Sequence, residues 1–319
     1  GRQVNAAARC HRLDGLEPDN WLAFLALLGL LRSLEEADRE TPEDVRWWPR
    51  VSWRLDPPPW RPVLHLAREV DRASLCARLE KGIDAFHAAY CFDGRKMPDF
   101  EPAAYRQLAE QAVCAADRPR LDILAAIATD QVRREKRSTV ASTPLCLLSG
   151  QGHQDFLPRL ATIPFRPSAE DGARNLEAAL YEPWHRKGDA TNSFRWDPKE
   201  TARQALMAGD PTDKDYKLGT ELGANRLAAI GLSILPVVAD RTGPDRAPTI
   251  PGCLRTGPEP WLAWPIWKEP ATPAAIRALL GHPGLREPGA LAGLGVVAVF
   301  RTAIVLIGRF KNVLPGECL

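Results

Sequence analysis

The sequence predicts an α+β fold in which a central buried helix is surrounded by small antiparallel sheets and a helical layer. Three observations support this: a long apolar helical segment near the start, short β-prone runs broken by prolines after it, and several later segments of helical composition. The 319 residues are 45% hydrophobic and 26% charged, which is typical of globular domains. The chain is therefore long enough for one large or two modest domains.

The central helix is expected to begin after Pro18, Asp19 and Asn20 and to run to about Glu40. Apolar residues occur all around this segment, which indicates burial on several sides. Its longest apolar stretch, residues 21–31, is too short to cross a bilayer, which takes roughly 20 residues as a helix. Acidic residues stand before it where a signal peptide carries positive charge. We therefore expect no membrane span and a cytoplasmic location.

Residues 1–140 are expected to hold this helix, a small sheet and the helical layer. Short β-prone pieces at residues 45–48, 51–55 and 63–66 predict the antiparallel sheet. Helical composition over residues 71–90, 102–116 and 120–135 predicts the layer.

Residues 141–319 are expected to form a C-terminal α+β part, or to continue the first part as one domain. Residues 144–148 predict a buried strand, and residues 182–219 predict a long loop, which usually has a function when it is ordered. The remaining expected helices lie near residues 155–160, 168–180, 223–232 and 273–280, and the remaining strands near residues 261–267 and 296–308.

Charge and cysteine content restrict the function classes. The 42 basic and 40 acidic residues give a net charge of +2, so nucleic-acid binding has to depend on local patches. The seven cysteines are scattered and odd in number, without a C-x-x-C pair, and are expected to be reduced core residues. They are Cys10, Cys76, Cys91, Cys114, Cys146, Cys253 and Cys318.

No pattern in the sequence predicts a metal site, a cofactor or catalysis. The six histidines are widely separated, and no glycine-rich phosphate or dinucleotide motif occurs in the right context. One alternative remains, a small hydrolase using Ser149, His153 and Asp155, although the segment lacks the first glycine of a nucleophile elbow. A turn that caps the next helix explains these residues better.

The long loop contains a segment, Trp184 to Pro198, that mixes cations, amides and aromatic rings. Lys187, Asn192, Phe194 and Arg195 are of the types that grip phosphates and stack on bases. Alternatively, Phe194 and Trp196 anchor the loop on the core while Arg195 pairs with Asp197 at the surface.

A basic run is the second candidate for phosphate binding. Arg133, Arg134, Lys136 and Arg137 could follow a nucleic-acid backbone. A basic helix end, favoured by the helix dipole, explains the run equally well.

Several blocks, in order, resemble proteins of type I CRISPR systems, especially subtype I-G, formerly I-U. Residues 13–32 resemble the amino-terminal helix signature of those families. Residues 194–198 (Phe-Arg-Trp-Asp-Pro) and 223–228 (Gly-Ala-Asn-Arg-Leu-Ala) are similar to two further blocks. Thr143-Pro144 with Ser149–Gln151 lies between the amino-terminal block and these two, as in that layout. The resemblance covers short blocks between residues 13 and 240.

This resemblance implies a large-subunit-like component of a Cascade-type surveillance complex with no catalytic activity of its own. Such a subunit helps recognise the motif beside the target and holds double-stranded DNA while CRISPR RNA pairs with it. Its implied partners are the other Cascade-type subunits, CRISPR RNA, target DNA and a helicase-nuclease recruited in trans. The chain is short for a large subunit, so a separate small subunit or a helicase-associated extension module is expected to share this role.

The resemblance implies that five residues contact nucleic acid: Asn192, Phe194, Arg195, Asn225 and Arg226. Arginine and asparagine can bond base edges with two hydrogen bonds. The competing interpretation is structural: Asn225 supports the preceding loop, Arg226 pairs with Asp197 or Glu221, and Gly223 with Ala224 allows close helix packing.

A third possibility is a scaffold that binds only proteins through exposed tryptophans. The candidates for such anchors are Trp47, Trp48, Trp53, Trp60, Trp261, Trp264 and Trp267.

Overall fold

The computed structural model describes residues 6–134, 137–148, 155–166, 169–200, 219–240, 247–256, 258–307 and 310–319. Its helices and small antiparallel sheets confirm the predicted α+β fold. None of the helices in these ranges combines the length and the hydropathy needed to cross a lipid bilayer.

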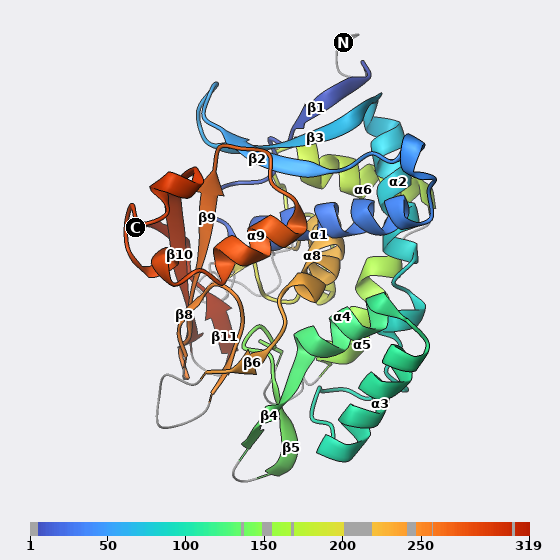
Figure 1. The fold of residues 1–319 in the computed structure, drawn as a ribbon, viewed down its shortest axis with the longest axis vertical. Helices are drawn as coiled ribbons and strands as arrows, with labels where there is room; N and C mark the ends of the chain where they lie inside the picture. The colour runs from blue at the N-terminus through green and yellow to red at the C-terminus, as the bar shows by residue number, and fades with distance from the viewer. Residues whose placement is uncertain are drawn as a thin grey trace, which may run out of the picture.

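Helix α1 (Trp21–Arg39) occupies the centre of the molecule, with a sheet above it, a second sheet at one end and helices on its remaining sides (Figure 1). Asn20 caps the helix, since its side-chain oxygen accepts a hydrogen bond from the Ala23 N–H at 3.2 Å. Nearly every residue of α1 is buried, as the all-round apolar pattern predicts.

Two glycines allow α1 to lie against α8 (Leu222–Gly231) at very short range. A Cβ atom added to Gly29 would lie 1.7 Å from the Leu227 carbonyl oxygen, and one added to Gly231 would lie 2.1 Å from that of Leu25. Any side chain at either position would therefore push the two helices apart.

The first sheet has the strand order β1–β3–β2 and is antiparallel throughout. Its strands are β1 (Ala8–Arg12), β2 (Arg50–Arg54) and β3 (Arg61–Val70). The predicted sheet is confirmed, except that residues 45–48 contain the end of a short 3-10 helix, Glu43–Val45, and no strand.

The second sheet has the order β11–β10–β9–β8, and β12 pairs with β10. The strands are β8 (Cys253–Arg255), β9 (Trp261–Trp267), β10 (Val296–Ile307), β11 (Phe310–Val313) and β12 (Glu317–Cys318). The two sheets meet where Val51 and Ala271 exchange backbone hydrogen bonds of 3.0 and 2.8 Å. Helix α9 (Pro273–Leu280) follows this contact.

The helical layer contains α2 (Arg72–Asp84), α3 (Pro102–Cys114) and α4 (Arg118–Ile127). The helix predicted over residues 120–135 is wrong beyond Ile127, because the chain continues as strand β4 (Ala128–Arg134), paired with β5 (Arg137–Ser142). Thr129, Val132, Thr139 and Val140 are β-branched residues, which favour strands.

The strand predicted at residues 144–148 is also wrong. Leu145, Leu147 and Leu148 are buried, but the segment is a turn followed by irregular backbone. A short apolar run shows burial and leaves the backbone conformation undecided.

The described residues also form the α-helices α5 (Phe156–Thr162) and α6 (Ala169–Tyr181), and β6 (Val238–Ala239) pairs with β7 (Pro248–Thr249). One hydrophobic cluster contains residues from both sides of residue 140, so that boundary does not divide the core. Of the seven free cysteines only Cys76 and Cys146 are buried, and the expectation that all seven lie in the core is wrong.

Candidate functional site

The loop at residues 184–200 is anchored to the interior by two stacked rings. Phe194 and Trp196 are both fully buried, and their ring centroids lie 4.5 Å apart. The Trp196 indole N–H donates to the Leu145 carbonyl at 2.9 Å. The alternative that these rings anchor the loop is confirmed, and Phe194 has no exposed face on which a base could stack.

Asp197 fixes the same loop through hydrogen bonds in the protein interior. It is buried and accepts a hydrogen bond from the Arg186 Nε at 2.6 Å and another from the Asn20 side-chain amide at 3.1 Å. The predicted surface pair of Arg195 with Asp197 is therefore wrong, since Arg186 takes that place. Arg195 itself is half-buried, with a backbone φ of 66°.

Asn225 supports this loop from α8. Its side-chain oxygen accepts from the Phe194 backbone N–H at 3.3 Å, and its amide group donates to the Thr220 hydroxyl at 2.8 Å. The side chain is completely buried, so the expected contact with nucleic acid is corrected to a structural role. Gly223 allows the close packing predicted for it, because an added Cβ would lie 2.1 Å from the Asn175 carbonyl oxygen.

Arg226 holds three helices together. Its two terminal nitrogens donate to both carboxylate oxygens of Glu80 on α2, at 2.7 and 2.6 Å. Its Nε donates to the Pro164 carbonyl at 2.9 Å, and its NH1 also donates to Asn175 on α6 at 3.1 Å. The predicted partners Asp197 and Glu221 are wrong, and this buried guanidinium has no surface left for a base or a phosphate.

Three of the predicted contacts in the loop remain at or near the surface. Lys187 is exposed, Asn192 and Arg195 are half-buried, and Asn192 accepts a hydrogen bond from Arg166 at 2.7 Å. All three stay predictions as contacts to nucleic acid.

The basic run is carried by the β4–β5 hairpin, so the interpretation of a basic helix end is wrong. Arg133 pairs in register with Val140, and Arg134 pairs with Arg137. Lys136 lies outside the described residues. A two-stranded basic ribbon is one of the shapes that fit against nucleic acid.

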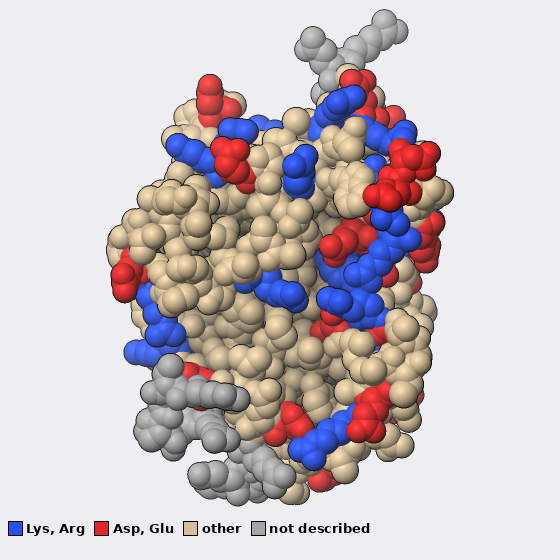
Figure 2. Space-filling view, in the orientation of Figure 1, with Lys and Arg blue, Asp and Glu red and all other residues tan. Residues whose placement is uncertain are grey.

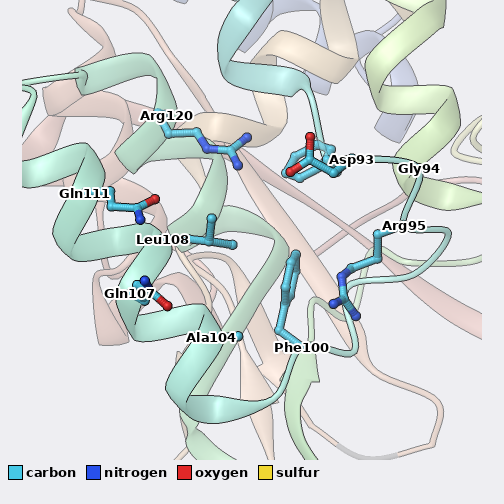
Figure 3. Close-up of a pocket in the computed structure, with 10 residues that line it drawn as sticks. Asp93, Gly94, Arg95, Phe100, Ala104, Gln107, Leu108, Gln111 and Arg120 are labelled. Carbon is cyan, nitrogen blue, oxygen red and sulfur yellow. The ribbon is translucent and has the colours of Figure 1, made fainter.

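A cavity of about 520 Å³ lies beside this hairpin, between α3 and the loop at residues 91–100. Figure 3 shows Gln107, Leu108 and Gln111 projecting from α3 on one side, with Arg95 and Phe100 on the opposite side. The two glutamines are four residues apart, which places them on one face of the helix. The loop turns at Asp93 and Gly94, where φ is 50° and 74°.

Two arginines and one carboxylate, that of Asp93, line the cavity. The Arg120 guanidinium lies 5.0 Å from the centre of the Phe92 ring and donates to the Ala89 and Cys91 carbonyls at 2.6 and 2.7 Å. Its burial lowers its pKa. Arg95 lies 4.7 Å over the Phe100 ring, and its pairing with Asp99 is loose at 3.7 Å. Sequence reasoning missed all these residues, because they are spread over 30 positions without a motif.

The hairpin and the cavity share a wall. The Val140 N–H of β5 donates to the Phe100 carbonyl at 2.9 Å, and Arg106 on α3 pairs with Asp130 on β4. The hairpin and α3 lie at the same end of the molecule in Figure 1. The cavity and the hairpin together, hereafter the α3–hairpin surface, combine guanidinium groups, amides and aromatic rings.

Charge is dispersed on the face seen in Figure 2, where basic and acidic side chains lie beside one another with broad uncharged areas between them. The net charge of +2 agrees with this, and binding of a polyanion then depends on local features.

The structure adds little support for the alternative sites, which are the hydrolase residues and the tryptophan anchors. Ser149 and His153 lie outside the described residues, and Asp155 accepts from Arg159 at 2.9 Å. Of the seven tryptophans considered as anchors, Trp53, Trp264 and Trp267 are buried and only Trp48 is exposed. Among the residues described, no group of three or more histidine, cysteine or acidic side chains is placed to hold a metal ion.

Comparison with known proteins found no matching family model, curated protein or solved structure.

Proposed function

We propose that this chain is a non-catalytic nucleic-acid-binding subunit of a type I CRISPR surveillance complex, which serves antiviral defence in the cytoplasm. In this role it helps recognise the target-adjacent motif and holds double-stranded DNA while CRISPR RNA pairs with one strand. Its partners are the other Cascade-type subunits and a helicase-nuclease that cuts in trans. The ordered sequence blocks support the family role.

The observation that carries the binding role is the α3–hairpin surface. Arg95 and Arg120 supply donors for phosphate or for guanine, and Gln107 and Gln111 supply the amides that pair with adenine. The basic hairpin beside them adds sequence-independent attraction to the backbone. Guanidinium groups next to hydrogen-bonding amides suit a ligand whose phosphates position it while its bases are read.

Binding is tested by fluorescence anisotropy with a labelled DNA duplex at several salt concentrations. We expect Arg95→Ala to weaken binding about ten-fold and to reduce the salt slope by about one, the effect of losing one phosphate contact. Gln107→Ala with Gln111→Ala is expected to reduce discrimination between duplex sequences and to leave the slope unchanged.

Arg286→Ala is the matched control, since it removes an exposed arginine that does not line the cavity. Equal affinities of the parent, Arg95→Ala and Arg286→Ala would contradict the proposed surface. Purification with the neighbouring gene products, followed by sequencing of bound RNA, tests the family role, and the absence of CRISPR RNA and Cas-type proteins would refute it.

A further inference from the structure

Trp48 is an exposed aromatic residue held in an unfavourable backbone conformation. Its side chain is 50% exposed, and its φ is 49°, in the left-handed region that bulky residues avoid. Such a conformation costs free energy and persists only where the surrounding structure enforces it. Exposure of a large ring at such a cost is a feature of binding sites.

A buried carboxylate enforces this conformation. Asp38, near the end of α1, accepts hydrogen bonds from the backbone N–H of Trp47 at 3.0 Å and of Trp48 at 2.9 Å. Arg78 on α2 pairs with Asp38 at 2.6 Å and lies 4.8 Å over the Trp47 ring. The backbone that presents Trp48 is thereby tied to two helices of the core.

A cavity of about 620 Å³ opens beside Trp48. Its apolar wall is formed by Trp48, Pro49, Ala67 and Pro273. This volume lies within the range of pockets that take small organic ligands. An aromatic ring at the edge of an apolar cavity suits a flat ligand that stacks on the ring.

Three arginines surround the same cavity. Arg46 lies 5.6 Å from the centre of the Trp48 ring, and Arg39 pairs weakly with Glu36 at 3.4 Å. Arg50 is exposed, and its guanidinium has no ion pair or hydrogen bond within the described part of the chain. Of the two carboxylates lining the cavity, Asp38 is already paired with Arg78, and Glu35 faces the buried Arg32 at 3.8 Å. The rim therefore retains positive charge.

We infer that Trp48 and this cavity form a second nucleic-acid site, which takes one unpaired base by stacking while Arg39, Arg46 and Arg50 face its phosphates. This inference rests on the proposed function and adds to it a site for single-stranded nucleic acid, separate from the α3–hairpin surface. Stacking on an aromatic ring together with cationic side chains is how proteins bind single strands irrespective of sequence.

The test uses the full chain and a fluorescein-labelled thymidine decamer. We expect Trp48→Leu, which retains apolar volume and loses the aromatic face, to weaken binding about ten-fold. Trp48→Tyr is expected to stay within about three-fold of the parent, because a ring remains. Val238→Ala, another exposed apolar residue, is the control and is expected to bind as the parent does. Thermal melts establish that each variant is folded.

A decamer of abasic residues separates stacking from charge, since it has the same phosphates and no bases. We expect the parent to bind it about ten-fold more weakly than thymidine, and Trp48→Leu to bind both strands equally. If Trp48→Leu binds thymidine as tightly as the parent, the site at Trp48 is refuted while the proposed function stands. If the parent binds neither the decamer nor duplex DNA, the proposed function fails and the second site fails with it.

Discussion

Two arginine-rich regions of this molecule have the same side chains in opposite surroundings. Around α8, Arg226 and Arg186 are buried and bound to carboxylates and carbonyls of the interior. Around α3, Arg95 borders a cavity and Arg120 lines it from a partly buried position. The polar residues at 223–228 serve the packing of the core, and the region around α3 has the side chains that the proposed binding requires.

This contrast shows how a group of polar residues close together in sequence can serve folding alone. A buried guanidinium loses its hydration and has to recover it through well-placed acceptors. Arg226 has five such contacts with other elements, which explains why its neighbours in sequence include the small residues that let helices approach. An arginine that binds a ligand needs the opposite arrangement, with donors left for the ligand.

The largest effect expected is on stability, from Arg226→Ala. Removing this side chain leaves Glu80 and the Pro164 carbonyl without their donor, and we expect a loss of about 3–5 kcal/mol in the free energy of unfolding. Urea denaturation followed by circular dichroism measures it. A loss below about 1 kcal/mol would show that Arg226 is not the structural clamp described above.

The next effect depends on pH and comes from Glu200. Burial, with a smaller contribution from the nearby Asp197, raises its pKa to about 7, against the hydrogen bonds from Ser193 and Thr220 that lower it. The folded state thus holds this proton more tightly than the unfolded state, whose carboxyl has the ordinary value of 4.5. The contribution of Glu200 to the free energy of unfolding is therefore lost as the pH rises from about 4.5 to about 7, and this contribution does not change further above that.

Glu200→Gln is expected to remove this loss of stability with rising pH. The variant should equal the parent near pH 4 and exceed it by about 2–3 kcal/mol at pH 8, where the parent holds a buried charge. Urea denaturation at a series of pH values from 4 to 8 measures the difference. An advantage that does not change with pH would mean that Glu200 does not titrate in this range.

A smaller effect is expected from Trp48→Gly. Glycine adopts a positive φ without strain, so the backbone at this position relaxes, while the exposed ring contributes little to the core. We expect the melting temperature to stay the same or rise by a few degrees, corresponding to about 1 kcal/mol or less. A clear loss of stability would indicate that the Trp48 ring is needed for folding.

The smallest effect on stability is expected from Arg95→Ala. Its ion pair with Asp99 is long and its side chain is exposed, so the free energy of unfolding should change by less than about 0.5 kcal/mol. Thermal and urea denaturation check this. If Arg95→Ala weakens binding and leaves stability unchanged, Arg95 is a binding residue, in contrast to the structural Arg226.

Elements with strong periodicity were predicted well, and elements defined by long-range pairing were not. The α1 helix, α9 and strand β9 follow from caps, prolines and apolar patterns within a few residues. The β4–β5 hairpin was missed, because Ala128–Arg134 follows a helix without a break in the sequence and only two of its seven residues, Thr129 and Val132, are β-branched. Its pairing with Arg137–Ser142 then completes the strand.

The sequence by itself determined the α+β class, the central buried helix and the absence of a large charge excess, since these depend on composition and on patterns local in the chain. Only the tertiary structure decided which arginines are available to a ligand. Arg226 pairs with Glu80, 146 positions away, and Arg120 lines a cavity while it bonds to the Cys91 carbonyl of the loop at residues 91–100. Burial is a property of the packed elements, so an arginine that binds a ligand and one that supports the core are identical until the chain has folded.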